Sequence, residues 1–286
     1  MRILIIGKGW LGGRCASEWK DAIISDAIIK TEGDVLRLLD EYKPDAVLNA
    51  AGVVGRPNVD WCETHQLETI AGNTVLPITI ANACQKRGVY LLHMGTGCIF
   101  YGDSPHGGPW TENDFGNPSA VYTRSKYSAD LALSTLPGVG IARIRMPIDD
   151  RSHPGNLVDK LVSYTKVIDV ENSVTIVPDM IKIFRALLEK KAEGIFHCTN
   201  PGSITHKQII ALYEKYVDPE HKNEWISESD LVAQGLAVKK RSNNIMTSLN
   251  LPKLGIMMRP IAEAMEETMK NYAAHRHSER SEGSIT

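Results

Sequence analysis

The sequence predicts an α/β chain with a doubly wound parallel sheet, on the strength of three observations. Apolar runs of strand length recur at residues 2–6, 46–49, 90–94 and 141–145. Segments with helical periodicity lie between them. A glycine-rich turn follows the first run directly. Runs without polar alternation are typical of parallel strands covered on both faces, and their alternation with helices is the pattern of a doubly wound sheet.

The helices of the first half follow in chain order. One begins at the glycine turn, and the next is expected at residues 36–42. A longer helix at 68–86 contains Pro77, which should kink it or mark its beginning. Another is expected at 123–136. The second strand of the sheet is hard to place, because residues 25–30 mix apolar and charged side chains.

The alternation loosens after Pro147, where we expect three helices and one more strand, at residues 158–164, 180–191, 207–216 and 195–198. Residues 151–274 should therefore form a second part, interleaved with the last strands of the same sheet. Residues 275–286 are polar and lack apolar periodicity, which predicts a disordered tail.

Composition excludes several classes of function. The chain has 286 residues, 43% of them hydrophobic, which can fill a sizeable core. The net charge is −2 with both signs scattered, so nucleic acid is not expected and a small-molecule partner is favoured. The apolar N-terminal run is only as long as a strand, which predicts neither a signal peptide nor a membrane span.

The cysteines indicate a reducing compartment. Five are present, widely spaced and without a Cys-x-x-Cys pair, at positions Cys15, Cys62, Cys84, Cys98 and Cys198. An odd number in this arrangement is typical of reduced thiols and not of a disulfide framework or a zinc site. The sequence predicts a cytoplasmic protein with no metal.

The glycine turn predicts a dinucleotide cofactor. Gly7, Gly9 and Gly12 form Gly-x-Gly-x-x-Gly between a strand and a helix. Such a turn lets the backbone approach a pyrophosphate, whose charge faces the helix N-terminus. Residues 1–150 are thus expected to be a Rossmann-type dinucleotide-binding part. The other residues expected at the cofactor lie in the turn, at strand ends or in the helix at 68–86: Lys8, Trp10, Leu11, Asn49, Ala50, Ala51, Gly52, Asn73, Met146 and Pro147.

The choice of dinucleotide stays open. An acidic residue after the second strand would hold a ribose 2′-hydroxyl, whereas basic residues would favour a 2′-phosphate. Asp26 and Lys30 offer both signs in this region. Lys8 and Arg14 flank the turn, which favours NADPH without excluding NADH.

Tyr122 and Lys126 predict the reacting centre. Four residues apart on one helix face, the cation can help the phenol act as an acid. Thr96 lies at the end of an upstream strand, and Thr96 and Cys98 should project from it to one side. If these groups meet, Thr96 and Tyr122 can both hydrogen-bond a carbonyl oxygen, Tyr122 giving its proton as hydride arrives at carbon. Lys126 would hold the nicotinamide ribose, and Cys98 alone would be interpreted as a small buried hydrophobe.

The chain resembles the extended short-chain dehydrogenase/reductases, within them the dTDP-4-dehydrorhamnose reductase branch, and most closely the plant nucleotide-rhamnose epimerase-reductases. Five segments over roughly residues 2–270 carry the resemblance: residues 55–63, 96–100, 145–148, 199–202 and 241–244. One departure is that the family usually has Gly-x-x-Gly-x-x-Gly, whereas Gly7 and Gly9 are one residue closer.

The resemblance implies an NADPH-dependent bifunctional enzyme that makes UDP-L-rhamnose. It would epimerise carbons 3 and 5 of UDP-4-keto-6-deoxy-glucose, with the dTDP form as a further substrate, and then reduce the ketone at carbon 4. The resemblance assigns acid/base roles to Cys98 and Lys160, implies action after a 4,6-dehydratase, and allows a homodimer. The implied substrate contacts, besides Thr96, are Arg56, Asn58, Gly97, Asn156, Arg241, Asn243 and Asn244.

Three alternatives stay open. One is a 4-reductase that needs a separate epimerase, and another is a GDP-fucose synthase. The third is a non-catalytic regulatory subunit of the methionine adenosyltransferase type. That alternative would require the loss of Thr96, Tyr122 or Lys126, and all three are present.

Overall fold

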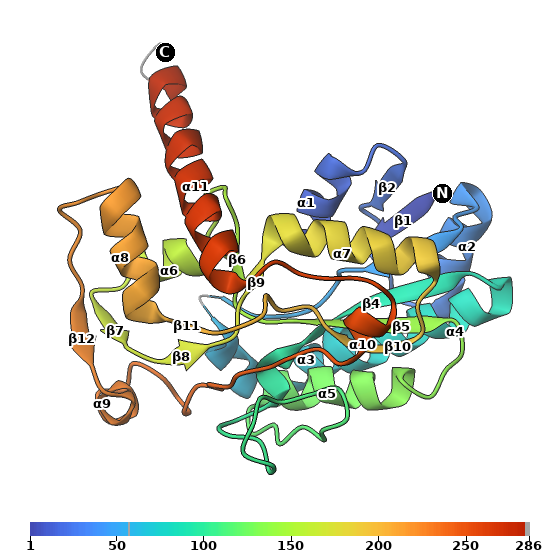
Figure 1. The fold of residues 1–286 in the computed structure, drawn as a ribbon. Coiled ribbons are helices and arrows are strands. Elements are labelled where there is room, and N and C mark those ends of the chain that lie inside the picture. Colours follow the sequence, from blue (N-terminus) through green and yellow to red (C-terminus); the bar gives the residue numbers. More distant parts are fainter. Residues whose placement is uncertain (57, 284–286) are drawn as a thin grey trace.

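The computed structural model describes residues 1–56 and 58–283, with side chains to residue 278. Its centre is a six-stranded sheet in the order β10-β5-β4-β3-β1-β2, in which every neighbouring pair is parallel (Figure 1). The predicted fold class is confirmed. The strands are β1 (Ile3–Ile6), β2 (Ala22–Ser25), β3 (Ala46–Asn49), β4 (Tyr90–Thr96), β5 (Val139–Ile144) and β10 (Gly194–His197).

Helices cover both faces of this sheet, which explains the apolar runs. Ile3 and Ile5 pack toward α1 (Trp10–Glu18) and α7 (Val177–Lys190), whereas Leu4 and Ile6 pack on the opposite face. That second face is covered by α2 (Glu32–Tyr42), α4 (Leu76–Arg87) and α5 (Val121–Leu133). A strand buried on both faces gains apolar burial at every position, so polar alternation is lost.

The helix expected at residues 68–86 is present with an internal change of winding. It consists of α3 (Gln66–Ile70), a π-helical turn η2 (Ala71–Val75), and α4. Pro77 lies in the first turn of α4, where its missing N–H costs little. The second strand, which was hard to place, is β2, and it ends at Ser25 before the charged residues begin.

The second part contributes the edge strand β10 and the covering helix α7 to the central sheet, and most of its other elements pack beside that sheet (Figure 1). Its three small sheets pair β6 (Pro147–Ile148) with β9 (Thr175–Ile176), β7 (Lys166–Ile168) with β12 (Glu224–Ile226), and β8 (Glu171–Asn172) with β11 (Ile204–Thr205). Its remaining helices are α6 (Leu157–Ser163), α8 (His206–Tyr216), α9 (Glu228–Ala233), α10 (Asn250–Lys253) and α11 (Ile261–Gly283). Strands of two or three residues are too short to leave a periodic signal.

The expected disordered tail from His275 is corrected, because α11 continues to Gly283. Besides its apolar packing, polar contacts near the expected start of the tail attach this helix to the body. The Tyr272 hydroxyl donates to Asp159 at 2.8 Å, the His275 Nδ1 pairs with the Asp150 carbonyl at 2.7 Å, and Arg276 donates to the Tyr213 hydroxyl at 3.0 Å. Tertiary contacts therefore order residues that have no apolar pattern of their own; residues 284–286 lie outside the described part.

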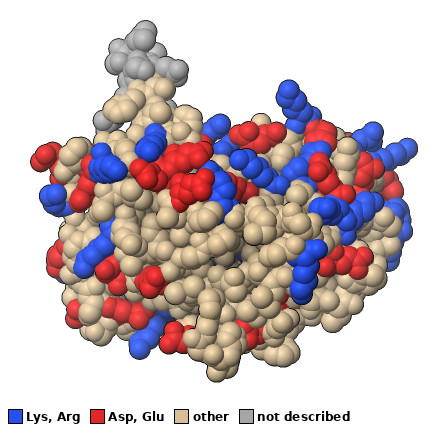
Figure 2. Space-filling model, in the orientation of Figure 1, with Lys and Arg blue, Asp and Glu red and all other residues tan. Residues whose placement is uncertain are grey.

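Charge is distributed as the composition indicated. Figure 2 shows basic and acidic side chains interspersed over the face in view, without a continuous stripe of either sign. Among the described residues, no helix combines the length and apolar character needed to cross a bilayer.

Candidate active site

The glycine turn lies at the carboxyl end of β1 and opens α1. Gly7 has a φ of +106°, and a Cβ there would lie 2.4 Å from the Ala51 backbone nitrogen. A Cβ on Gly12 would lie 2.0 Å from the Gly7 carbonyl oxygen. A Cβ on Gly9 would meet nothing within 4 Å. Gly7 and Gly12 are thus required by the fold, whereas Gly9 keeps the space before the helix N-terminus open, where a pyrophosphate would approach.

The segment after β3 lies against this turn. The Asn49 Oδ1 accepts from the Ala51 backbone N–H at 3.1 Å, which shapes the chain as it leaves the strand. Asn73, in the π-helical turn, makes two hydrogen bonds with the Val53 backbone. Its Oδ1 accepts from the N–H and its Nδ2 donates to the carbonyl oxygen, both at 2.8 Å. Asn49 and Asn73 therefore shape the walls of the predicted cofactor site.

Met146 has a backbone conformation that is rare for its residue type. Its φ is +40°, and it joins β5 to β6 at Pro147. A non-glycine residue in the left-handed region costs free energy and persists only where the surroundings enforce it. Such strain at a strand end is consistent with the cofactor role expected for Met146 and Pro147.

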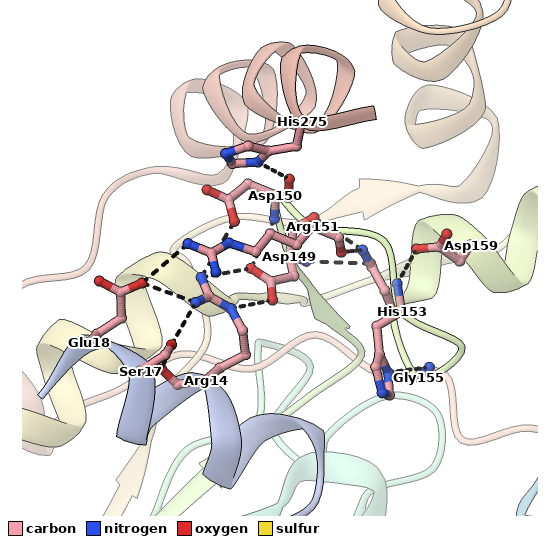
Figure 3. Close-up of polar contacts among 11 residues, drawn as sticks. Arg14, Ser17, Glu18, Asp149, Asp150, Arg151, His153, Gly155, Asp159 and His275 are labelled. Atoms are coloured by element: carbon pink, nitrogen blue, oxygen red, sulfur yellow. Dashed lines mark hydrogen bonds and ion pairs between the residues drawn. The ribbon is translucent and has the colours of Figure 1, made fainter. Parts of the chain in front are cut away.

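The structure corrects the part given to Arg14 in choosing the cofactor. Arg14 is buried, and its guanidinium Nε donates to Asp149 at 2.8 Å (Figure 3). Burial alone would lower the pKa of Arg14, but Asp149, Glu18 and Asp150 outweigh it and raise that pKa. The Arg14 charge is therefore neutralised by carboxylates of the protein, so it does not support the choice of a cofactor with a 2′-phosphate. Lys8 remains exposed, 3.6 Å from the Asp26 carboxylate.

The Arg14 cluster joins the glycine-turn helix to the segment that leads into α6. Figure 3 shows Arg14 reaching from α1 toward Asp149 and Asp150, with His275 of α11 on the far side. Nearby, the Trp10 and His153 rings stack with centroids 4.8 Å apart. The predicted cofactor residue Trp10 thus also contacts the second part of the molecule.

Thr96 and Cys98 are neighbours, but not in the way expected. Thr96 is the last residue of β4, whereas Cys98 lies in a 3-10 turn, η3 (Gly97–Ile99). The Thr96 Oγ1 accepts from the Cys98 backbone N–H at 3.2 Å. The pairing of the two residues therefore depends on this cap and not on strand alternation. Cys98 is partly exposed, while the other four cysteines are buried.

Tyr122 and Lys126 lie in α5, beside the end of β4. Burial and the nearby Cys98 raise the pKa of Tyr122, and a hydrogen bond with Thr96 acts in the opposite direction. Tyr122 therefore stays protonated over the working range of an enzyme and can serve as an acid. The Lys126 Nζ donates to the Met94 carbonyl at 2.7 Å, and burial lowers the pKa of Lys126 to about 8.

His93, which the sequence analysis did not identify, connects Asn49 to Lys126. Its Nδ1 lies 3.0 Å from the Asn49 Nδ2, and its Nε2 lies 3.3 Å from the Lys126 Nζ. Burial and Lys126 hold the pKa of His93 well below its usual range. A histidine inside an apolar strand run has no local signal that separates this role from a packing role.

Cys98 and Lys160 act on each other electrostatically, although they come from different parts of the chain. Burial lowers the pKa of the half-buried Lys160, and Cys98 partly opposes this effect. Arg145 also reaches the thiol, with its Nη1 3.5 Å from the Cys98 Sγ. The structure thus assembles Thr96, Cys98 and Tyr122 with two cations from the β5 end and α6.

The predicted substrate residues divide into two groups. Arg241 forms a two-pronged ion pair with Asp60, at 2.8 and 3.0 Å, which joins its loop to η1 (Val59–Glu63). Asn244 donates to the Gly97 carbonyl at 3.1 Å and so lies beside η3. The segment of Asn244 therefore lies beside Cys98, whereas the Arg241 guanidinium is already paired with a carboxylate.

Of the remaining predicted substrate residues, two cap helices, one hydrogen-bonds another side chain and one is exposed. Asn156 is fully buried and caps α6 by accepting from the Val158 N–H at 3.2 Å. Asn58 caps η1 in the same way. Asn243 donates to Glu228 at 2.8 Å, and Arg56 is exposed. Their substrate contacts stay predictions.

The arrangement suits chemistry at a carbonyl group. Thr96 and Tyr122 provide two hydroxyls that can hold one oxygen, and Lys126 lies on the adjacent turn of α5. Cys98 and Lys160 add a thiol and an amine, which can accept or donate protons at a neighbouring carbon.

Comparison with known proteins finds relatives in sequence and in fold. A bifunctional dTDP-4-dehydrorhamnose 3,5-epimerase/dTDP-4-dehydrorhamnose reductase of Arabidopsis thaliana is 35% identical over 261 residues, covering 87% of this chain and 85% of that protein. Longer plant enzymes also match, and this chain spans 39% to 41% of their length.

Two solved structures share the fold. A UDP-rhamnose synthase from Acanthamoeba polyphaga mimivirus superposes with a TM-score of 0.87 at 29% identity, covering 95% of this chain and 99% of that one. A Bacillus anthracis dTDP-4-dehydrorhamnose reductase in complex with NADP gives 0.81 at 20% identity, over 95% and 96% of the two chains.

These similarities confirm the resemblance found in the sequence, both to the epimerase-reductases and to the dTDP-4-dehydrorhamnose reductases. The family described as RmlD substrate binding domain matches residues 1–273. The chain therefore belongs to the RmlD substrate-binding-domain family.

Proposed function

We propose that the chain is a bifunctional enzyme of nucleotide-rhamnose synthesis. Its substrate is UDP-4-keto-6-deoxy-glucose, whose carbons 3 and 5 it epimerises before reducing the carbon 4 ketone with NADPH to give UDP-L-rhamnose. One observation carries the proposal: the partly exposed Cys98 hydrogen-bonds Thr96 through its backbone N–H at 3.2 Å, and both Tyr122 and Lys160 lie within electrostatic range of its thiol, so an epimerisation pair adjoins the reductive group.

The proposed cofactor is held by the glycine turn, and NADPH supplies the hydride when bound. The open space at Gly9 fits a pyrophosphate, and the exposed Lys8 can reach a 2′-phosphate. The Bacillus anthracis neighbour binds NADP, which supports the same choice. Asp26 favours NADH by the same reasoning, so the ratio of kcat/KM for the two cofactors tests the preference.

Reduction requires a proton at the carbon 4 oxygen. Thr96 and Tyr122 hydrogen-bond this oxygen, and the Tyr122 hydroxyl donates its proton as hydride reaches the carbon. Lys126 stabilises the phenolate that remains. Burial keeps the Tyr122 proton in place until the transition state forms, because it raises the pKa of Tyr122.

Epimerisation uses the same ketone. The carbon 4 carbonyl acidifies the hydrogens on carbons 3 and 5, and the resulting enolate is held by Thr96 and Tyr122. The Cys98 sulfur takes the proton from one face of the sugar, and the Lys160 ammonium returns a proton to the other face. Both groups regain their original protonation state by exchange with water.

Hydrogen exchange tests the epimerase half alone. The protein is incubated with UDP-4-keto-6-deoxy-glucose in heavy water without NADPH, and deuterium at carbons 3 and 5 is measured by mass spectrometry. We expect incorporation well above a sample without protein. Absence of label would leave a 4-reductase that depends on a separate epimerase.

Substitutions separate the two halves. Tyr122→Phe removes the proton donor and should lower reduction by about 10²-fold or more. Cys98→Ala and Lys160→Ala should abolish L-rhamnose formation but leave reduction of the unepimerised ketone, giving a 6-deoxy sugar of different configuration. L-rhamnose formed at the parent rate by either variant would assign that residue a structural role.

Other parts of the proposal follow from the substrate. A 4-keto-6-deoxy sugar must come from a 4,6-dehydratase, so the enzyme acts after one. A cytoplasmic location and a homodimer are further parts of the proposal. The dTDP sugar is the second substrate to assay, because the Arabidopsis relative is named for it. GDP-4-keto-6-deoxy-mannose tests the fucose synthase alternative, and turnover of any of them excludes a purely regulatory subunit.

A further inference from the structure

Arg145 is a buried cation without a carboxylate partner. Its side chain is 1% exposed and follows β5. Within the part of the chain that the structure describes, its partners are the Cys98 Sγ at 3.5 Å, the Ser242 Oγ at 3.4 Å and, at shorter range, the Ser242 carbonyl and the Asn172 Oδ1. The guanidinium Nε has no partner there. All of these partners except the thiol are permanently neutral.

A second arginine two residues earlier provides the comparison. Arg143 is also buried, at 2% exposed, but its Nε donates to the Asp130 carboxylate at 2.9 Å. An isolated buried charge costs several kcal/mol, which is why buried charges are normally paired. Arg143 follows this rule through Asp130. Two groups able to become anions act on Arg145, Cys98 and Tyr101, and of these only the Cys98 thiol is within hydrogen-bond distance of its guanidinium.

We propose that Arg145 is a positioning residue that holds Cys98 as a thiolate in the resting protein. The groups that face Cys98 favour a negative charge on its sulfur. Arg145 from the end of β5 and Lys160 from α6 are cations, and burial keeps Tyr122 from α5 neutral. A thiolate beside an arginine is favoured at neutral pH, and the thiolate is the basic and nucleophilic form. Burial lowers the pKa of Arg145, and Cys98 and, after it, Tyr101 oppose that shift.

The inference deepens the proposed function and rests on it for its purpose. A resting thiolate needs no prior deprotonation: its sulfur lone pair takes the sugar proton, forming an S–H bond as the C–H bond breaks, and the electron pair moves to the carbonyl oxygen. The Arg145 guanidinium then faces a neutral thiol, so it also favours return of that proton to water before the next turnover.

Alkylation of the native protein tests the inference without any substrate. Cys98 is the one partly exposed thiol among the described cysteines, and burial raises the pKa of the other four. The rate of reaction with iodoacetamide is measured from pH 5 to 10, with the modified peptide identified by mass spectrometry and Cys98→Ser as the background. We expect a half-maximal rate at least about one pH unit below the value of about 8.5 for free cysteine.

Variants at Arg145 separate charge from packing. Arg145→Gln should raise the pH of the half-maximal rate by about one unit or more, which at pH 6.5 slows alkylation about tenfold, whereas Arg145→Lys should retain much of the low-pH reactivity. Circular dichroism checks that each variant is folded. If Arg145→Gln does not fold, the wild-type profile and Arg145→Lys still decide the question.

A wild-type midpoint at or above that of free cysteine, or one that Arg145→Gln leaves unchanged, would overturn the inference. The result is distinguishable from failure of the proposed function. Low-pH alkylation without deuterium incorporation would keep the thiolate and remove the epimerase. Deuterium incorporation with the alkylation profile of free cysteine would keep the epimerase and remove the thiolate.

Discussion

Lys126 loses its charge within the range in which enzymes are assayed, because burial lowers its pKa to about 8. Its neighbour Tyr122 behaves differently, since burial raises the pKa of the phenol and keeps it protonated at higher pH. His93 faces Lys126 from β4, and Asp130 faces it from its own helix. Of the two groups assigned to reduction, Lys126 is therefore the one that titrates first on the alkaline side.

We predict that kcat/KM for reduction falls as pH rises through about 8. The sign follows from the charged form: Lys126 is an ammonium below this pH and a neutral amine above it, and the ammonium stabilises the developing phenolate. Lys126→Arg keeps its charge throughout and should show lower activity without the fall near pH 8. A wild-type profile that stays flat to pH 10 would remove Lys126 from this role.

Only some residues of the candidate site could be predicted from the sequence pattern alone. Spacing on a helix and position at a strand end predicted Thr96, Tyr122 and Lys126 as site candidates, because helical and strand periodicity place such groups in space. Cys98 and Lys160 gained roles only from the family resemblance, since a lone thiol and a helix lysine are ordinary residues. The role of a buried polar side chain in an apolar run depends on its tertiary partners, so the roles of Arg145 and His93 could be inferred only from the structure.

At the scale of elements, the glycines of the turn have different roles: Gly12 is required by the fold, whereas Gly9 is proposed to leave room for the cofactor. Gly9 caps α1 with a φ of −69°, which any residue can adopt, and its missing Cβ would meet nothing. Gly9→Ala should therefore change the free energy of unfolding by no more than about 0.5 kcal/mol. NADPH binding should weaken about tenfold or more, because the methyl group occupies the pyrophosphate approach.

Gly12→Ala is the matched control. Its Cβ would lie 2.0 Å from the Gly7 carbonyl oxygen, so the turn must move and the protein should lose about 1–3 kcal/mol of stability. Urea unfolding and fluorescence titration with NADPH measure both quantities for both variants. Unchanged affinity in a stable Gly9→Ala protein would show that the cofactor does not approach this turn.

Element prediction succeeded where burial leaves a long signal. The central helices and all the central strands except β2 were found because their apolar positions repeat over several turns or a full strand. The helix α11 was missed, although Ile261, Met265, Met269 and Tyr272 repeat on one face and pack in the second core. The strands of two residues left no pattern to find, because their pairing is set entirely by tertiary contacts.

At the scale of the whole molecule, Arg14 and Asp149 tie the glycine-turn helix α1 to the segment between β6 and α6, across 135 positions of sequence. Asp149 is fully buried, so Arg14→Met leaves an uncompensated charge and should destabilise the protein by about 3–5 kcal/mol. Adding Asp149→Asn removes that charge. The double variant should recover much of the loss, as measured by urea unfolding, and strictly additive losses would argue against a coupled pair.

The placement of β10 has a consequence for how the molecule can be divided. This edge strand comes from the second part, and it shields the flank of β5 while α7 covers one face of the sheet. A chain ending at residue 150 would present an unpaired strand edge beside an uncovered apolar surface, a combination that promotes aggregation. The boundary expected at this position is therefore not a line along which the protein can be cut into units that fold alone.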